Sequence, residues 1–145
     1  MVPSLTHLDD QEYARLLAFR MELRRFLRWS DQQAATVELT GAQHQLLLAI
    51  RGHPDSRGPS VSELADYLCT RHHSAVQLID RTEQLGLITR NRGDSDDRRV
   101  VRLTLTTAGQ QKLGLLTATH LEELRRLAVL VNAAIDPAVN APQAR

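Results

Sequence analysis

The feature that most constrains how this chain can fold is the stretch DSDDRRVVRLTLTTAG, residues 94–109. Its acidic first half follows Gly93, and Gly, Asp and Ser are the residues that tight turns favour. In its second half, apolar and polar residues alternate with the period of two that buries one face of a strand. The apolar positions are Val101, Leu103 and Leu105. With the run 87–92 before it, this stretch predicts a charged β-hairpin that carries Arg98 and Arg99 near its tip.

Composition limits the classes of protein to consider. The chain has 145 residues, 42% of them apolar, and a net charge of +1, so any nucleic-acid function must come from local charge and not from a polybasic chain. A single cysteine, Cys69, excludes an intrachain disulfide and suits a reducing cytosol. No apolar run approaches the roughly 20 residues that span a bilayer, and no signal peptide is recognisable. We therefore expect a cytoplasmic protein that does not enter a membrane.

A long amphipathic helix is predicted near each end of the chain. From Asp9 or Asp10 to about Ala35, apolar residues recur at spacings of three and four. One small domain cannot cover so long a stripe, so we expect half of a subunit interface there, with packing inside the subunit as the alternative. The second helix is predicted over residues 107–135, with Thr106 as its N-terminal cap. Gly109 and Gly114 should weaken the first turns of this helix by roughly 1 kcal/mol each.

Three shorter helices are predicted between them. Thr40 and Gln43 have the spacing of a capping box before a helix that ends near residue 50, and Ser60 and Glu63 repeat this spacing before a helix that ends at Cys69. The third runs from about residue 71 to 85 and stops at a left-handed Gly86. Its inward-facing residues are predicted to be Ala75, Leu78, Ile79, Thr82 and Leu85. A helix-turn-helix followed directly by a charged hairpin is a winged helix.

The order of these elements and the residues at their junctions resemble the MarR family of bacterial transcriptional regulators. The family has an Asp- and Arg-bearing turn, then a strand, then Leu-Thr-x-x-Gly. This chain matches that pattern with Asp94, Asp97, Arg98, Arg99, Leu105, Thr106 and Gly109. The helix before the hairpin ends in the family manner at residues 79–81 (IDR) and 85–88 (LGLI). The resemblance covers roughly residues 40–116.

The resemblance implies a mainly α fold with a small β-hairpin. It places a winged helix-turn-helix lobe at residues 40–105, dimerisation helices at 9–38 and 107–135, and a flexible tail at 136–145. It further implies a homodimer without a cofactor that reads a near-palindromic operator in double-stranded DNA, as a repressor that a small aromatic effector relieves. Trp29 and His120 are candidates to line the effector cavity, and simple packing is the alternative for both.

The physical chemistry of the helix over residues 71–85 supports DNA binding independently. The exposed N-terminal residues of the second helix in a helix-turn-helix face base edges in the major groove. Here they are Arg71, His72, His73, Ser74 and Gln77. Gln can pair with adenine and Arg with guanine, while Ser can bond either. Arg81 lies further along the helix and is better placed for a phosphate.

The hairpin tip is the second predicted contact. By resemblance to the family, Asp97 braces Arg99, which enters the minor groove beside Arg98. The electrostatic reason is that a narrow A-tract groove concentrates negative potential and attracts a guanidinium. The alternative is a solvated tip with ordinary surface ion pairs.

Other functions find less support in the sequence. His72 and His73 lie close to Cys69, but neighbouring helical residues point about 100° apart, so we predict no metal site. We expect Cys69 to be a small residue that fills a tight turn, with redox sensing as the alternative. No nucleophile, base and orienting residue form a recognisable trio, so we do not expect an enzyme. The remaining alternative is a winged-helix adaptor that binds proteins and not an operator.

Overall fold

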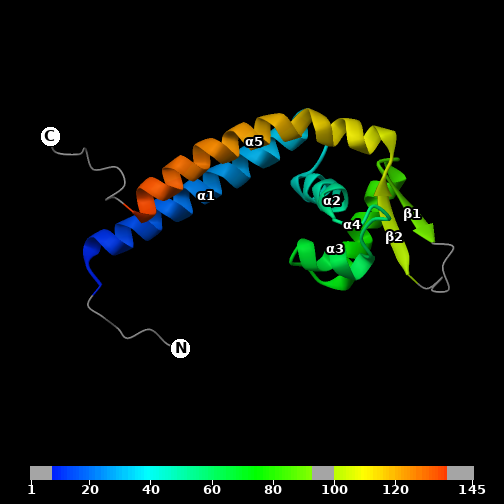
Figure 1. Ribbon diagram of the computed structural model, residues 1–145, viewed down its shortest axis with the longest axis horizontal. Helices are drawn as coiled ribbons and strands as arrows, with labels where there is room; N and C mark the ends of the chain where they lie inside the picture. The colour runs from blue at the N-terminus through cyan, green and yellow to red at the C-terminus, as the bar shows by residue number, and fades with distance from the viewer. Residues whose placement is uncertain (1–7, 93–99, 137–145) are drawn as a thin grey trace. The chain divides into compact units, whose positions relative to one another are not determined.

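The computed structural model describes residues 8–92 and 100–136 (Figure 1). It contains two long helices, three short ones and one antiparallel hairpin, so the predicted mainly α fold with a winged helix-turn-helix is confirmed. The elements are α1 (Asp10–Thr36), α2 (Gly41–Gly52), α3 (Val61–Tyr67), α4 (His72–Gln84), β1 (Ile88–Arg92), β2 (Val101–Leu105) and α5 (Thr107–Ile135). Among the described residues, no helix is long and apolar enough to cross a membrane.

The chain divides into two compact units. Residues 31–118 form one unit, with the last turns of α1, the whole of α2 to β2, and the start of α5. The other unit contains α1 up to Ser30 and α5 from Thr119 onward. Both long helices therefore contribute residues to both units.

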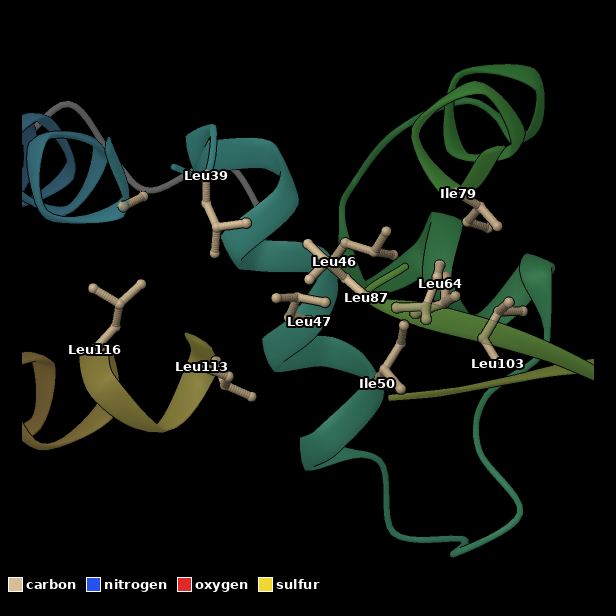
Figure 2. Close-up of a cluster of buried hydrophobic side chains, with 12 residues drawn as sticks. Leu39, Leu46, Leu47, Ile50, Leu64, Ile79, Leu87, Leu103, Leu113 and Leu116 are labelled. Atoms are coloured by element: carbon tan, nitrogen blue, oxygen red, sulfur yellow. The ribbon is translucent and has the colours of Figure 1, made fainter. Parts of the chain in front are cut away.

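The core of the unit 31–118 is built mainly from leucine and isoleucine side chains, and α1 contributes Ala34 to it (Figure 2). The inner face of α2 is formed by Leu46 and Leu47, which are fully buried, and by Ile50, which is nearly so. They meet side chains from α3, α4, the hairpin and α5. These are Leu64, Ile79, Leu87, Ile88, Leu103, Leu113 and Leu116.

Leu85 departs from the predicted inner face of α4. Its side chain is 56% exposed, whereas Leu87 is 3% exposed. Leu85 is the C-cap of α4, and the chain then turns through Gly86, whose φ is +75°. Because α4 ends at Gln84, the helical period no longer directs Leu85 inward. The left-handed Gly86, predicted from the sequence, turns the chain so that Leu87 enters the core instead.

The helix starts are fixed by the predicted caps. In the capping box of α2, Thr40 N–H donates to Gln43 Oε1 (2.9 Å) and Gln43 N–H donates to Thr40 Oγ1 (3.1 Å). Ser60 and Glu63 form the same box before α3. However, α3 ends at Tyr67 and not at Cys69, because the chain turns through Cys69 with a φ of +50°.

The hairpin pairs β1 with β2 in antiparallel register, from Ile88 opposite Leu105 to Arg92 opposite Val101. Leu103 is fully buried at the centre of β2, while Val101 and Leu105 are half-buried against the core. On the other edge of β2, Leu103 N–H donates to the carbonyl of Pro59 at 2.9 Å. The segment before α3 thus pairs with β2 through one isolated antiparallel bridge, between Ser60 and Arg102.

In the unit with residues 10–30 and 119–135, α1 and α5 lie side by side and leave a large apolar surface exposed. Phe26 and Trp29 of α1 contact the ring of His120, and the Ser30 hydroxyl lies 2.8 Å from His120 Nε2. Many other apolar side chains of these helices are at least two-fifths exposed. They include Tyr13, Leu16, Leu17, Met21, Leu23, Leu27, Leu121, Leu124, Val129 and Ile135.

Gly109 has a packing role that the sequence did not indicate. It is buried in the first turn of α5, and a Cβ there would lie 2.1 Å from the carbonyl oxygen of Leu87. Around Gly114, by contrast, a Cβ would meet nothing within 4 Å. The expected weakening of α5 thus applies to Gly114, whereas Gly109 permits the close approach of α5 to the start of the hairpin.

These two glycines form a matched pair for mutagenesis. Gly109→Ala should lower the free energy of unfolding by roughly 1–3 kcal/mol, because the new methyl group forces two backbones apart. Gly114→Ala should raise it by up to about 1 kcal/mol through helix propensity. Urea denaturation at one fixed protein concentration measures both, and equal effects of the two changes would contradict the packing role of Gly109.

Candidate nucleic-acid interface

The second helix of the helix-turn-helix, α4, has one face in the core and one in solvent. Ala75, Ile79 and Thr82 are buried, so the helix is held against α2 and α3 by a narrow apolar stripe. The opposite stripe contains His73, Gln77 and Arg81, four residues apart and all exposed. Residues at this spacing lie one above the other on a helix.

The structure brings together the predicted contacts of α4. Arg71 is the N-cap, with extended backbone angles and no side-chain capping bond, and it is exposed like His72 and His73. Ser74 is half-buried at the edge of this surface. The helix therefore starts with polar and cationic side chains directed to solvent. The predicted contacts Asp97, Arg98 and Arg99 lie outside the described residues.

The turn between α3 and α4 differs from the expectation for Cys69. The residue does occupy a tight turn, since Cys69 N–H donates to the Asp66 carbonyl at 3.1 Å. Its side chain is exposed and so does not fill space in the turn. Within the described ranges, no three His, Cys, Asp or Glu side chains are grouped so as to hold a metal ion.

Arg90 of β1 joins the β1–β2 hairpin, which is the wing of the winged helix, to the exposed side of α4. Its Nη1 donates to Glu83 Oε1 at 2.8 Å, and its Nη2 donates to Asp80 Oδ1. The hydrogen bond with Asp80 raises the pKa of Arg90 above its ordinary value. From the sequence, Arg90 counts as one more local positive charge, but the structure shows that it is paired with two carboxylates. The i, i+3 spacing of Asp80 and Glu83 was the available signal for a shared partner.

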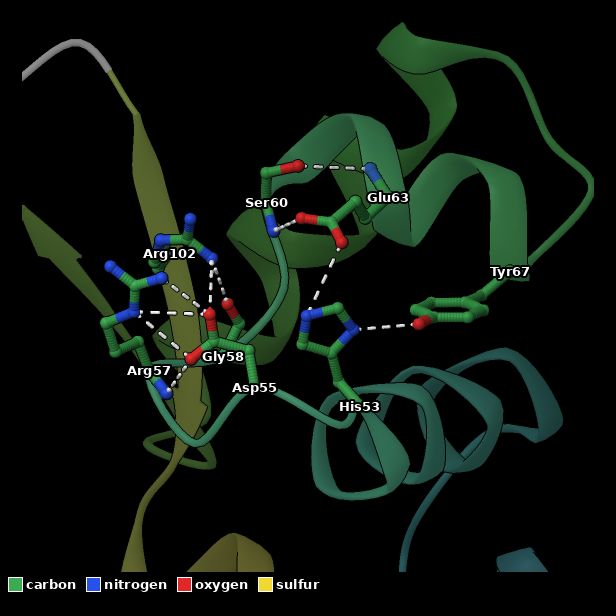
Figure 3. Close-up of polar contacts among 8 residues, drawn as sticks. All are labelled: His53, Asp55, Arg57, Gly58, Ser60, Glu63, Tyr67 and Arg102. Carbon is green, nitrogen blue, oxygen red and sulfur yellow. Dashed lines mark hydrogen bonds and ion pairs between the residues drawn. The ribbon is translucent and has the colours of Figure 1, made fainter. Parts of the chain in front are cut away.

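A polar network fixes the segment that precedes α3 (Figure 3). The His53 side chain, only 6% exposed, lies with Nδ1 2.7 Å from the Tyr67 hydroxyl and Nε2 3.4 Å from Glu63 Oε2. On the hairpin side, Arg102 Nη1 donates to the Gly58 carbonyl at 3.0 Å. Arg102 is thus committed to holding β2 against this segment. The sequence indicated only the Ser60–Glu63 part of the network.

The carboxylates of this network are held in their charged form. Hydrogen bonds from Arg57 hold the pKa of Asp55 well below its usual range. The backbone N–H of Ser60 lowers the pKa of Glu63, and the nearby His53 and Arg102 contribute in the same direction. The N-terminus of α3 is therefore stabilised by an ionised side chain.

The two effector candidates are also neighbours, but they have different surroundings. The rings of Trp29 and His120 are 4.7 Å apart between centroids. Trp29 lines a cavity of about 200 Å³ between α1 and α5, and His120 is not part of its lining. The lining residues are Glu22, Arg25, Phe26, Trp29, Glu123, Arg126, Leu127 and Leu130. His120 instead packs between Phe26, Trp29 and Ser30.

Comparisons with known proteins agree with the winged-helix architecture. A sequence model described as the MarR family matches residues 38–99. No curated protein sequence matches the chain at a significant level. The model match supports the resemblance to the MarR family over these residues, and the solved structures show that the chain shares the fold of that family.

Three of these structures illustrate the similarity. AbsC, a MarR family transcriptional regulator from Streptomyces coelicolor, has a TM-score of 0.71 at 19% identity, and the match covers 93% of this chain and 96% of AbsC. MepR of Staphylococcus aureus in a DNA complex has a TM-score of 0.65 at 24% identity, with 77% and 80% covered. A MarR variant from E. coli with operator DNA has a TM-score of 0.63 at 22% identity, with 79% and 78% covered.

The capping network generates a pH prediction. Because the folded state lowers the pKa of Glu63, its ionised form stabilises the protein above the unfolded-state pKa of about 4.3, and this stabilisation is lost as the pH falls through the lowered folded value. Glu63→Gln should therefore be less stable than wild type at neutral pH, and the difference should vanish in acid.

Ser60→Ala is the matched control. It removes the hydroxyl acceptor of the capping box and should cost about 1 kcal/mol, but it keeps the Ser60 N–H that lowers the pKa of Glu63. Its stability curve should therefore run below that of wild type and keep most of the acid slope, because the Ser60 hydroxyl contributes less to the lowered pKa of Glu63 than the Ser60 N–H does. Denaturation series between pH 3 and 7 measure these slopes, and a Glu63→Gln slope equal to that of wild type would contradict the assignment.

Proposed function

We propose that this chain, which shares the MarR-family winged-helix fold, is a dimeric, sequence-specific transcription regulator that binds double-stranded DNA. The observation that carries the proposal is the exposed polar surface of α4, where Arg71, His72, His73, Gln77 and Arg81 face solvent on a helix anchored by its other face. A helix presented in this way fits the major groove. The DNA-bound structures of MepR and MarR, which have the same fold, add support.

Each side chain on this surface has a proposed role that follows from its chemistry. Gln77 reads adenine by a pair of hydrogen bonds, and Arg71 reads guanine. His72, His73 and Ser74 contact neighbouring base edges or phosphates at the start of the helix. Arg81, one turn beyond Gln77, binds a phosphate and sets the position of the helix without reading sequence.

The hairpin is proposed to make the second contact. The register of β1 and β2 places Arg92 opposite Val101, so the end of β1 and the start of β2 lie side by side. Residues 93–99 connect those ends and contain Asp97, Arg98 and Arg99. We assign Arg99 to the minor groove, with Asp97 as its brace and Arg98 beside it, because a narrow groove attracts guanidinium groups.

The exposed apolar side chains of α1 and α5 support a homodimer. Exposed apolar side chains in this number mark an interaction site. Leu16 and Phe19 also line a cavity of about 350 Å³ with Ala134 and Ile135 near the ends of the two helices, which a second copy would cover. We assign residues 9–38 and 107–135 to this interface. Two recognition helices about 34 Å apart would then read a near-palindromic operator.

Repression and its relief by a small aromatic molecule complete the proposal. The cavity beside Trp29 combines aromatic and leucine side chains with two arginines and two glutamates, a lining that accepts a planar molecule with a polar edge. Trp29 is the single tryptophan of the chain, so its fluorescence reports ligand entry directly. An unchanged spectrum at saturating concentrations of such molecules would argue against this site.

Fluorescence anisotropy with DNA from the region upstream of the protein's own gene tests the function as a whole. We expect binding that prefers one sequence over random DNA and weakens steeply with salt, since released counterions dominate the affinity. Equal, weak binding to all sequences would contradict operator recognition. The protein-binding adaptor would then become the better interpretation.

Gln77 and Arg81 should differ in the kind of loss they cause. Gln77→Ala should cost roughly 1–3 kcal/mol on the preferred sequence and leave binding to random DNA unchanged. Arg81→Ala should weaken both alike and reduce the slope of log affinity against log salt by about 0.9. Titrations of both variants on both DNAs at several salt concentrations distinguish these outcomes, and identical behaviour of the two variants would contradict the assigned roles.

Leu16 is a direct test of the dimer interface. Leu16→Glu should produce a monomer, because it places a charge in the apolar surface of α1, and it should weaken operator binding because one half-site alone remains. Leu85→Glu on α4 is the control, since Leu85 is equally exposed (56% against 57%) but lies on the other unit. Light scattering measures the molecular mass of the wild type and of both variants. A monomeric wild type, or a Leu16→Glu variant that is still a dimer, would contradict the proposed interface.

A further inference from the structure

Two acidic residues flank the surface of α4 that is proposed to meet DNA. Asp80 lies three residues beyond Gln77, and Glu83 lies three beyond Asp80, so both occupy the stripe next to His73, Gln77 and Arg81. Their side chains are 48% and 37% exposed. Two free carboxylates at this place would repel the phosphates of a bound duplex, which carries one negative charge per about 1.7 Å of its helix axis.

Arg90 prevents the two carboxylates from being free. One guanidinium nitrogen binds Glu83 at 2.8 Å while the other binds Asp80, so a single side chain bridges both. The fork geometry of arginine allows this, whereas a lysine has one point charge to offer. Arg90 is itself only 33% exposed, and its position on β1 opposite Leu103 is fixed by the hairpin register.

We propose that Arg90 is a positioning residue for DNA recognition, which neutralises Asp80 and Glu83 and draws them toward the wing so that α4 presents its polar and cationic stripe to the duplex. The inference rests on the proposed function and extends it. In this proposal, Arg90 contacts no base itself, but from its strand it controls the charge of the recognition helix. The same bridge joins β1 to α4, so it also sets where the wing lies beside that helix.

A direct phosphate contact by Arg90 is the competing interpretation, and a mutant cycle separates the two. Arg90→Met removes the charge and leaves the carboxylates unpaired. The double change Asp80→Asn with Glu83→Gln removes what Arg90 neutralises, and the triple variant combines them. If Arg90 acts through the carboxylates, its removal is harmful only while they are charged.

Anisotropy titrations on the preferred DNA measure the cycle. Arg90→Met should weaken binding on the order of tenfold or more, because two uncompensated negative charges face the phosphates. The double variant should bind at least as well as wild type, and the triple variant should recover to within roughly threefold of the double variant. A triple variant as weak as Arg90→Met would overturn the inference and show that Arg90 contacts DNA itself.

Two controls keep these outcomes interpretable. Arg81→Met, in a residue assigned to phosphate, should not be rescued by the double change, so rescue of both arginines would overturn the specific role of Arg90. If Arg90→Met does not fold, as judged by circular dichroism, Arg90→Lys replaces it and should show a smaller loss with the same rescue; no rescue overturns the inference. Absence of sequence-preferring binding by the wild type would overturn the proposed function itself, which is a distinguishable result.

Discussion

The junction around the Thr106 hydroxyl is the contact on which the unit of residues 31–118 depends. This hydroxyl donates to the Gly86 carbonyl at 2.7 Å and accepts the Gly109 N–H at 3.1 Å, while Thr106 N–H donates to the Leu87 carbonyl at 3.0 Å. The end of α4, the start of β1 and the start of α5 are therefore held by one residue. A larger residue at position 109 would separate them, because a Cβ there meets the Leu87 carbonyl oxygen at 2.1 Å. The helix α4, the hairpin and the helix α5 all begin or end at this point.

The local charge around α4 cannot be obtained by counting residues. Arg90 and Arg102 lie on adjacent strands, and both are occupied inside the protein: Arg90 with Asp80 and Glu83, Arg102 with the Gly58 carbonyl. Arg71 and Arg81, by contrast, are exposed on α4. The difference follows from where the fold places each side chain. The hairpin register brings Arg90 to the carboxylates of α4 and Arg102 to the segment before α3, whereas Arg71 and Arg81 lie on the exposed side of α4. The charge that a partner meets is therefore decided by the fold and not by the sum.

Much of the architecture could be predicted because its signals are local. Thr40 and Ser60 announce their helices through side-chain bonds to residues three positions away, and Gly86 marks a backbone angle that few other residues adopt. What could not be predicted depends on contacts between distant segments. Gly109 appears as a weak helix residue until Leu87 is placed against it, and nothing in the sequence pairs His53 with Tyr67. Wing residues Asp97, Arg98 and Arg99 remain predictions from resemblance.

The bridge between Arg90 and the two acidic residues of α4 also shows why stability and binding give different measures of one interaction. Between exposed groups in water, an ion pair contributes about 0–1 kcal/mol to folding, because solvent and salt screen it. When a duplex covers α4, water is displaced and the phosphates add negative charge, so an unpaired carboxylate there becomes more costly than it is in the free protein. If α4 binds DNA as proposed, the same guanidinium is therefore worth more in the complex than in the free chain. A residue of this kind is explained by the bound state it prepares, and measurements of stability alone would underestimate it.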